Sequence, residues 1–207
     1  MERRQQATVF IVDDDEVVLN ELHALLIDQG FKTHIFSCAE GFLSQYHPKA
    51  PGCLLLDVHM PDISGLELQH TLKDIGSILP IIFMSAHADI PTAVQAMKEG
   101  AFDFLQKPVD KKKLLSYIHE ALELDAKNRR ELVTRQSVLR RIKKLSPREK
   151  QVMDKIAAGK TNKLIARELQ LSPRTIEIYR THVMLKMQAK SAIELIKLLD
   201  SCQYCSA

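Results

Sequence analysis

The sequence predicts a doubly wound α/β domain with a five-stranded parallel sheet, followed by an all-α domain joined to it by a helical linker. Short apolar runs alternate with helical periodicity through residues 1–123, whereas residues 143–207 show helical periodicity alone. The charge also changes sign, because residues 1–123 hold 10 basic and 18 acidic side chains and residues 124–207 hold 19 and 8. Net charges of −8 and +11 indicate different partners for the two parts, and the basic part is expected to bind a polyanion.

A membrane surface is the other polyanion that a basic domain could bind. That interpretation requires an amphipathic helix with large apolar side chains opposite the Lys and Arg residues, and the basic part has closely spaced helix starts and turns instead. No run approaches the length of a membrane span, and the first six residues lead directly into a strand-like run. We therefore expect a cytoplasmic protein without a membrane partner.

Five apolar runs are predicted to form the strands of the sheet, over residues 7–12, 31–36, 52–57, 79–84 and 102–105. Helices are predicted between them, starting near residues 16, 37, 65, 89 and 110. Gly30 and Gly100 are expected to end the first and fourth helices, and Ser37-Cys38-Ala39-Glu40 has the spacing of a capping box at the start of the second.

Polar residues follow these predicted strands, and they carry the chemistry of the domain. Asp13, Asp14, Asp57, Ser85 and Lys107 each stand at a predicted carboxyl end. Carboxyl ends of parallel strands share one edge of a sheet, where ligands of open α/β sheets bind. Closely packed carboxylates would hold protons or a hard cation such as Mg²⁺, and a lysine and a hydroxyl would bind a phosphoryl group that an Asp oxygen attacks. An Asp57 that only caps its loop is the alternative.

The first part resembles the receiver domain of bacterial two-component response regulators, over essentially residues 7–123. The resemblance is carried by Val12-Asp13-Asp14-Asp15, Leu56-Asp57-x-x-Met60-Pro61-x-x-Ser64-Gly65, Met84-Ser85-Ala86-His87 and Phe104-Leu105-Gln106-Lys107-Pro108. It implies a flavodoxin-like sheet of strand order 2-1-3-4-5 and phosphorylation of Asp57 by a sensor histidine kinase. It also implies Mg²⁺ held by Asp14, Asp57 and the main-chain carbonyl of His59, with Asp13 acting through water.

The same resemblance implies a switch next to the phosphorylation site. Ser85 would move to hydrogen-bond the phosphoryl oxygens, and Phe104 would turn into the vacated space. Lys107 would pair with the phosphate, and Lys107-Pro108 would be a cis peptide bond. His59 and His87 occupy positions that often tune the lifetime of the phosphoryl group, with plain exposed loop residues as the alternative.

Three domain bounds are expected: a receiver over residues 1–123, a helical linker over 124–142 and a DNA-binding domain over 143–207. No Gly or Pro interrupts residues 111–145, which favours one long helix that could pair between two protomers or serve as a solvated spacer. Ser146-Pro147-Arg148-Glu149 is a helix start, and a short helix from Thr161, a turn at 170–172 and a helix from Pro173 form a helix-turn-helix pattern.

Residues 146–199 resemble the LuxR-type DNA-binding domain, through Leu145-Ser146-Pro147-Arg148-Glu149, Asn162-Lys163-x-Ile165-Ala166 and Arg174-Thr175-Ile176-Glu177-x-Tyr179. The resemblance implies that a helix over 172–188 enters the major groove. Glu177, Ile178 and Thr181 would approach base edges, and phosphates would be held by Lys160, Arg174, Thr175, Arg180 and Lys186. Tyr179 and Arg180 depart from the usual residues of this family, which leaves the base contacts open.

With both parts together, the chain is similar to response regulators of the NarL/FixJ group, closest to the FixJ-like members. That implies a transcription regulator whose phosphorylation favours a homodimer on paired half-sites of promoter DNA, with RNA polymerase as a further partner. It would be no enzyme beyond hydrolysis of its own phosphoryl group. The alternatives are a phosphatase or phosphotransferase that forms an aspartyl phosphate, and an RNA-binding or architectural protein.

The four cysteines do not predict a disulfide framework. Cys38 and Cys53 lie in apolar stretches and are expected in the core. Cys202 and Cys205 form a single Cys-x-x-Cys near the end of the chain, for which a plain tail is the main interpretation and a metal or redox site the alternative.

Overall fold

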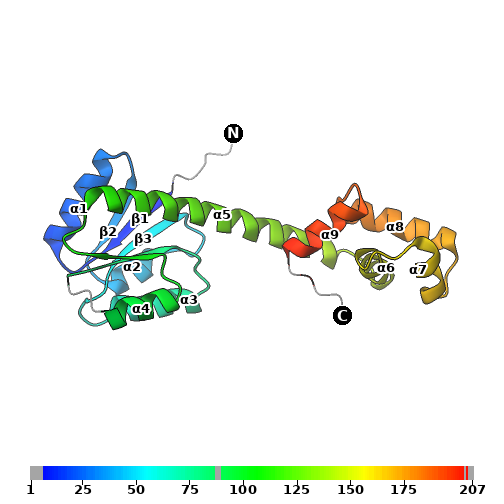
Figure 1. The fold of residues 1–207 in the computed structure, drawn as a ribbon, viewed down its shortest axis with the longest axis horizontal. Helices are drawn as coiled ribbons and strands as arrows, with labels where there is room; N and C mark the ends of the chain where they lie inside the picture. The colour runs from blue at the N-terminus through cyan, green and yellow to red at the C-terminus, as the bar shows by residue number, and fades with distance from the viewer. Residues whose placement is uncertain (1–6, 87–89, 203, 205–207) are drawn as a thin grey trace. The chain divides into compact units, whose positions relative to one another are not determined.

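A computed structural model describes residues 7–86, 90–202 and 204 of the chain. The chain divides into two compact units, residues 1–129 and residues 130–207. Figure 1 shows the helices and strands of both units. The division falls inside the segment predicted as the linker, and each unit is described by itself below.

The first unit contains a five-stranded parallel sheet in the order β2-β1-β3-β4-β5. The predicted fold class and strand order are therefore confirmed. The strands are β1 (Thr8–Val12), β2 (Lys32–Phe36), β3 (Gly52–Asp57), β4 (Ile81–Ser85) and β5 (Asp103–Gln106). β1, β3 and β4 are buried along their whole length, as is typical of parallel strands covered on both faces.

Five helices alternate with these strands and cover both faces of the sheet. They are α1 (Glu16–Asp28), α2 (Ala39–Gln45), α3 (Gly65–Asp74), α4 (Ile90–Lys98) and α5 (Lys111–Lys143). Two apolar clusters fill the layers, because successive strand residues face opposite sides. One joins the sheet to α2, α3 and α4, and the other joins it to α1 and the first part of α5; Figure 1 shows these layers.

The predicted start of the second helix is wrong by one residue. The helix begins at Ala39 with Cys38 as its N-cap, whose Sγ accepts a hydrogen bond from the Gly41 amide at 3.4 Å. Ser37 lies outside the helix, so Glu40 falls one position too early for a capping box. The register that the helix adopts buries Ala39 and Phe42, which shows that core packing outweighs a local capping pattern here.

The second unit is built from the end of α5 and the helices α6 (Pro147–Ala157), α7 (Asn162–Leu169), α8 (Pro173–Met187) and α9 (Ala192–Ser201). Val138 and Ile142 of α5 lie in its core. Local capping starts each of the other helices, and the N-cap side chains are Ser146, Thr161, Ser172 and Ser191. Gln170 ends α7 in the left-handed conformation with φ 55°, which makes the tight turn into α8.

No helix among the described residues is long and apolar enough to cross a membrane. Cys53 is buried in the core as expected, whereas Cys38 is half-buried at the N-cap of α2. Cys202, interpreted as part of a plain tail, is instead buried in the core of the second unit, because the end of α9 packs there. Cys205 lies outside the described residues.

Candidate functional site

Asp57 is the last residue of β3, and its surroundings hold it firmly at the carboxyl edge of the sheet. Its Oδ2 accepts a hydrogen bond from the His59 amide at 2.6 Å. The next helix begins close by, because the Gly65 amide donates to the Val58 carbonyl at 3.0 Å. A Cβ on Gly65 would lie 2.2 Å from the Asp57 carbonyl oxygen, so the approach requires glycine.

Lys107 brings two of the predicted carboxylates together. Its Nζ lies 2.5 Å from Asp57 Oδ1 and 2.6 Å from Asp13 Oδ2. Burial alone would lower the pKa of Lys107, but the hydrogen bonds to Asp13 and Asp57 and the negative charges of these carboxylates together raise the pKa above its ordinary value. The Lys107 amide also donates to the Ser85 carbonyl at 2.8 Å, and the Lys107-Pro108 bond is cis as predicted.

Asp13 is fully buried beneath this lysine. Burial raises the pKa of its carboxyl, and the hydrogen bonds from Lys107 and from the Asp15 amide offset part of that effect. The raised pKa means that ionising the Asp13 carboxyl costs more free energy in the folded state than in the unfolded chain. The neighbouring Lys107 ammonium offsets part of that cost.

The close cluster of three carboxylates is not found. Asp14 is exposed, and the described ranges contain no group of three or more His, Cys, Asp or Glu side chains arranged to hold a metal ion. The Lys107 ammonium contacts Asp13 and Asp57 and offsets one of their two negative charges. The donors available at this edge, two carboxylates with Asp14 adjacent in the chain, are all oxygens, which is the chemistry that suits Mg²⁺.

The two predicted switch residues lie on neighbouring strands. Ser85 is buried at the end of β4, opposite Gln106 of β5 in the register. Phe104 is half-buried, and its ring stacks on that of Phe83 with the centroids 6.3 Å apart. His59 is exposed, and His87 lies outside the described residues.

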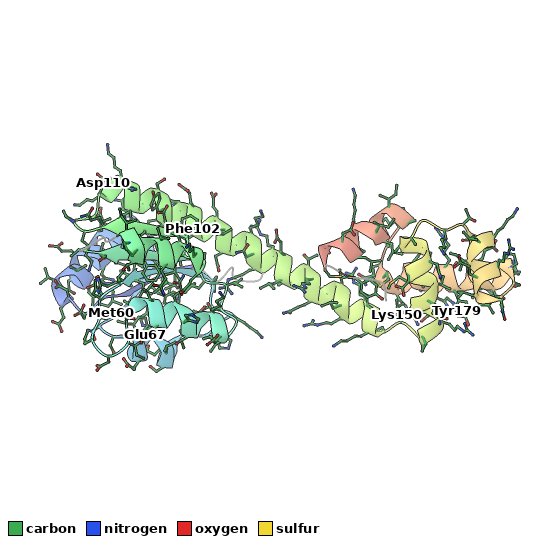
Figure 2. The ribbon with its side chains drawn as sticks, turned by 60° about the horizontal axis from the view of Figure 1, so that its bottom comes forward. Met60, Glu67, Phe102, Asp110, Lys150 and Tyr179 are labelled. Atoms are coloured by element: carbon green, nitrogen blue, oxygen red, sulfur yellow. The ribbon has the colours of Figure 1, made fainter. Side chains whose placement is uncertain are left out.

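The predicted recognition helix α8 presents an exposed face. Glu177, Ile178 and Thr181, the residues predicted to approach base edges, are all exposed, and Ile178 retains 52% of its accessible surface. Thr181 Oγ1 donates to the Glu177 carbonyl at 2.9 Å, so its methyl group and the Glu177 carboxylate stay available on that face. Tyr179, labelled in Figure 2, is instead half-buried against the core of the second unit.

The residues predicted to hold phosphates fall into two groups. Arg174 is exposed and Thr175 is half-buried next to the N-cap, Ser172. The other three have partners within their own unit: Lys160 pairs with Glu168, Arg180 with Asn162 and Lys186 with Glu149. Binding DNA through these three would require exchange of an internal partner for a phosphate oxygen.

Glu149 connects the N-cap of α6, Ser146, with Lys186 near the end of α8. Its Oε2 accepts hydrogen bonds from Lys186 Nζ and from the Ser146 amide, both at 2.7 Å. The contact with Lys186, followed by the one with Ser146, lowers the pKa of Glu149 to about 2. The capping pattern in the sequence revealed the helix start, whereas the bond to Lys186 joins residues 37 positions apart and no local pattern indicated it.

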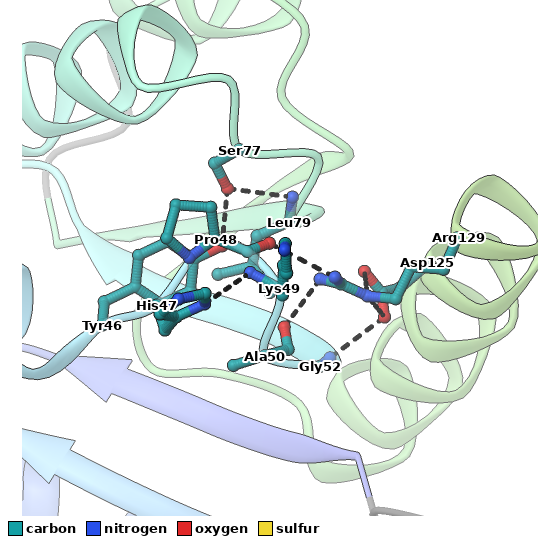
Figure 3. Close-up of polar contacts among 10 residues, drawn as sticks. All are labelled: Tyr46, His47, Pro48, Lys49, Ala50, Gly52, Ser77, Leu79, Asp125 and Arg129. Carbon is teal, nitrogen blue, oxygen red and sulfur yellow. Dashed lines mark hydrogen bonds and ion pairs between the residues drawn. The ribbon is translucent and has the colours of Figure 1, made fainter. Parts of the chain in front are cut away.

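One polar cluster was not predicted from the sequence: Arg129 and Asp125 of α5 contact the turn between α2 and β3 (Figure 3). The Asp-to-Arg spacing of four residues on a helix is a recognisable ion-pair pattern, but on an exposed face it would carry little weight. This ion pair differs from an ordinary surface pair because Asp125 is only 1% exposed. Burial depends on the tertiary structure, so the spacing in the sequence could not indicate it.

Comparison with known proteins identifies both units. Residues 9–119 match the response regulator receiver domain, and residues 143–199 match the bacterial regulatory proteins of the luxR family. The chain is 43% identical to the transcriptional regulatory protein FixJ of Bradyrhizobium diazoefficiens, over 92% of this chain and 93% of that one. It is 39% identical to the response regulator protein TodT of Pseudomonas putida, over 94% and 86%.

Solved structures agree with this comparison. The response regulator StyR matches with a TM-score of 0.84 at 40% identity, covering 94% of this chain and 98% of that one. Full-length FixJ from B. japonicum matches with a TM-score of 0.59 at 40% identity, covering 98% of this chain and 100% of that one.

A receiver domain joined to a LuxR-type domain is the domain composition of transcription regulators that are switched by phosphorylation. The comparisons therefore do not favour a phosphatase or phosphotransferase. The chain therefore belongs to the bacterial response regulators that combine a receiver domain with a LuxR-type helix-turn-helix domain, the NarL/FixJ group.

Proposed function

We propose that a sensor histidine kinase phosphorylates Asp57, and that the phosphorylated chain dimerises and binds paired half-sites of promoter DNA more tightly. The main support is the contact of Lys107 Nζ with both Asp57 and Asp13 at the carboxyl edge of the sheet. Such a site offers a nucleophilic carboxylate together with a fixed positive charge for the incoming phosphoryl group.

The transfer needs few groups from the protein. A carboxylate oxygen of Asp57 attacks phosphorus while the bond between phosphorus and the histidine nitrogen of the kinase breaks, so the phosphoryl group moves without a change of redox state. Lys107 would pair with the phosphoryl oxygens. Asp13, Asp14, Asp57 and the carbonyl of His59 would hold Mg²⁺, which neutralises negative charge on the carboxylates and the phosphoryl group.

The switch would use residues of the two strands that follow β3 in the sheet, Ser85 on β4 and Phe104 on β5. Ser85 would hydrogen-bond a phosphoryl oxygen, and Phe104, which is half-buried against the apolar cluster beneath α2, α3 and α4, would turn inward. The surface of α4, β5 and α5 would then favour a homodimer. The only reaction expected of the chain itself is hydrolysis of its own acyl phosphate.

The second unit would read DNA with α8 in the major groove. Glu177, Ile178 and Thr181 would contact base edges, and Lys160, Arg174, Thr175, Arg180 and Lys186 would hold phosphates. The exposure of the first three supports this arrangement. RNA polymerase would be a further partner at the promoter. A protein that binds promoter DNA in this way would act in the bacterial cytoplasm.

The test is phosphorylation of the full chain by a small phosphodonor with Mg²⁺, followed by intact mass measurement and DNA binding. We expect one phosphoryl group per chain, slow decay and a gain in affinity for specific duplexes, all lost in Asp57→Asn. Asp62→Asn is the matched control, because Asp62 is an exposed turn residue with φ 64° that Asn tolerates equally well. Continuous turnover of the donor by the wild-type chain would instead support a phosphatase.

A further inference from the structure

Arg129 is the last residue of the first unit, and all three of its guanidinium nitrogens are engaged. Nε donates to both carboxylate oxygens of Asp125, at 2.9 and 2.8 Å, one helical turn earlier on α5. The two terminal nitrogens donate to main-chain carbonyls of the turn before β3, with Nη1 3.2 Å from the Pro48 oxygen and Nη2 2.6 Å from the Ala50 oxygen. Figure 3 shows these contacts.

Asp125 contacts both Arg129 and the first residue of β3. Its Oδ2 also accepts a hydrogen bond from the Gly52 amide at 3.1 Å, and its side chain is only 2% exposed. A buried carboxylate is stable only when it is paired and hydrogen-bonded, so Arg129 and Asp125 depend on each other. A lysine at position 129 would preserve the charge but not the planar fork that reaches several acceptors at once. We name this set of contacts between Asp125, Arg129 and residues 48–52 the α5 clamp.

The α5 clamp holds the beginning of the strand that carries Asp57. β3 runs from Gly52 to Asp57, and a Cβ on Gly52 would lie 2.0 Å from the Thr8 carbonyl oxygen. The start of β3 is therefore packed directly on β1 and has little freedom to shift alone. A single buried strand therefore joins Asp57 to the Gly52 amide, which donates its hydrogen bond to Asp125.

Beyond Arg129 the helix loses this support. Residues 130–136 are all exposed, and the next buried residue is Val138, which belongs to the core of the second unit. Farther along, Arg141 Nη1 donates to the Met187 carbonyl at the end of α8, at 2.9 Å. The α5 clamp thus lies directly before the exposed stretch of α5, whose last turns pack in the core of the second unit.

We infer that Arg129 is a positioning residue for the switch: the α5 clamp ties the helix that enters the DNA-binding unit to the strand that carries Asp57. The inference rests on the proposed function, because it concerns how phosphorylation at Asp57 alters DNA affinity. A merely structural clamp would affect the stability of the receiver alone. A clamp that transmits the switch also determines the coupling factor, the ratio of the DNA dissociation constants without and with phosphorylation.

The experiment compares Arg129→Lys with Arg130→Lys in the full chain, since Arg130 is the exposed neighbour on the same helix. For Arg129→Lys we expect unchanged phosphorylation and unchanged DNA affinity in the unphosphorylated form, with a coupling factor about tenfold lower. Amide hydrogen exchange over residues 124–131 should accelerate in Arg129→Lys and stay unchanged in Arg130→Lys.

Asp125→Asn and the double variant test whether the two side chains act together. The double variant should lower the coupling factor no further than Arg129→Lys alone, because either change opens the same clamp. A coupling factor of Arg129→Lys within twofold of the wild type would overturn the inference, and so would additive losses in the double variant. Asp125→Asn provides the same comparison if Arg129→Lys does not fold. Absence of any DNA-affinity gain in the phosphorylated wild-type chain would refute the proposed function instead.

Discussion

At the scale of single residues, the site depends on one cation shared by two carboxylates. Lys107 contacts Asp13 and Asp57, which lie 94 and 50 positions away in the chain. Since two carboxylates share one ammonium, the site carries a net negative charge that phosphorylation increases. This charge balance is the physical reason that a divalent cation is expected to assist the transfer.

Gly65 allows α3 to approach the phosphorylation site closely. We expect Gly65→Ala to lower the free energy of unfolding of the first unit by about 1–3 kcal/mol and to slow phosphorylation, since the new Cβ would meet the Asp57 carbonyl oxygen at 2.2 Å. Denaturant unfolding and the phosphorylation rate measure the two effects. Gly41→Ala is the control, because its Cβ meets the Cys38 Sγ at 3.3 Å and α2 gains helix propensity. Equal losses in both variants would contradict this account.

Glu149 should make the second unit sensitive to acid. Its pKa in the folded state is lowered from 4.5 to about 2 by Lys186 and the Ser146 amide, so its stabilising contribution is complete above pH 4.5 and is lost as the pH falls toward 2. We expect Glu149→Gln to reduce stability at pH 7 by about 1–2 kcal/mol and to flatten the decline in this range. Thermal unfolding at several pH values measures both the stability at pH 7 and its decline in acid, and Glu177→Gln, at an exposed position, is the control. Parallel pH profiles would disprove the role of Glu149.

At the scale of elements, the receiver was largely predictable because its central strands β1, β3 and β4 are mostly apolar and buried along their length. Apolar residues fill both faces of β3 and β4, and turn residues follow them. Local signals also identified α7, its turn and α8. The hydroxyl groups of Thr161 and Ser172 cap the two helices, and Pro173 is favoured at the first position of a helix. Where a local signal competed with burial, as at Ser37, burial decided the boundary.

Two changes on α8 should separate positioning from base recognition. Arg174→Ala should weaken binding to all duplexes by a similar factor, because a phosphate contact carries no sequence information. Glu177→Ala should change the preferred base at one position by about 1–3 kcal/mol. Binding to a set of duplexes with one substituted position each distinguishes the two, and exposed Lys197→Ala on α9 serves as the control. A uniform loss for Glu177→Ala would argue against a base contact.

At the scale of the whole molecule, the charge is divided between an acidic receiver and a basic DNA-binding part, with −8 and +11 on residues 1–123 and 124–207. Four of the predicted phosphate contacts are cationic, namely Lys160, Arg174, Arg180 and Lys186. Each cation that reaches a phosphate adds about −0.9 to the slope of log affinity against log salt. The number of units on the DNA is therefore measurable from salt dependence.

We expect this slope to be about −4 for the unphosphorylated chain and about −7 for the phosphorylated chain on paired half-sites, because a dimer places two basic units on the duplex. Fluorescence anisotropy titrations at several salt concentrations measure it. Asp57→Asn treated with the same phosphodonor should retain the smaller slope. An equal slope in both forms of the wild type would show that phosphorylation acts without recruiting a second unit.

The sequence by itself determined the two domains, the order of elements, the edge that holds Asp57 and the helix-turn-helix, because periodicity, caps and turns depend on residues a few positions apart. Only the tertiary structure decided that Lys107 lies between Asp13 and Asp57, that Lys186 bonds Glu149, and that Arg129 engages Asp125 and the turn before β3. These contacts join distant parts of the chain, and their strength comes from burial, which no local pattern encodes.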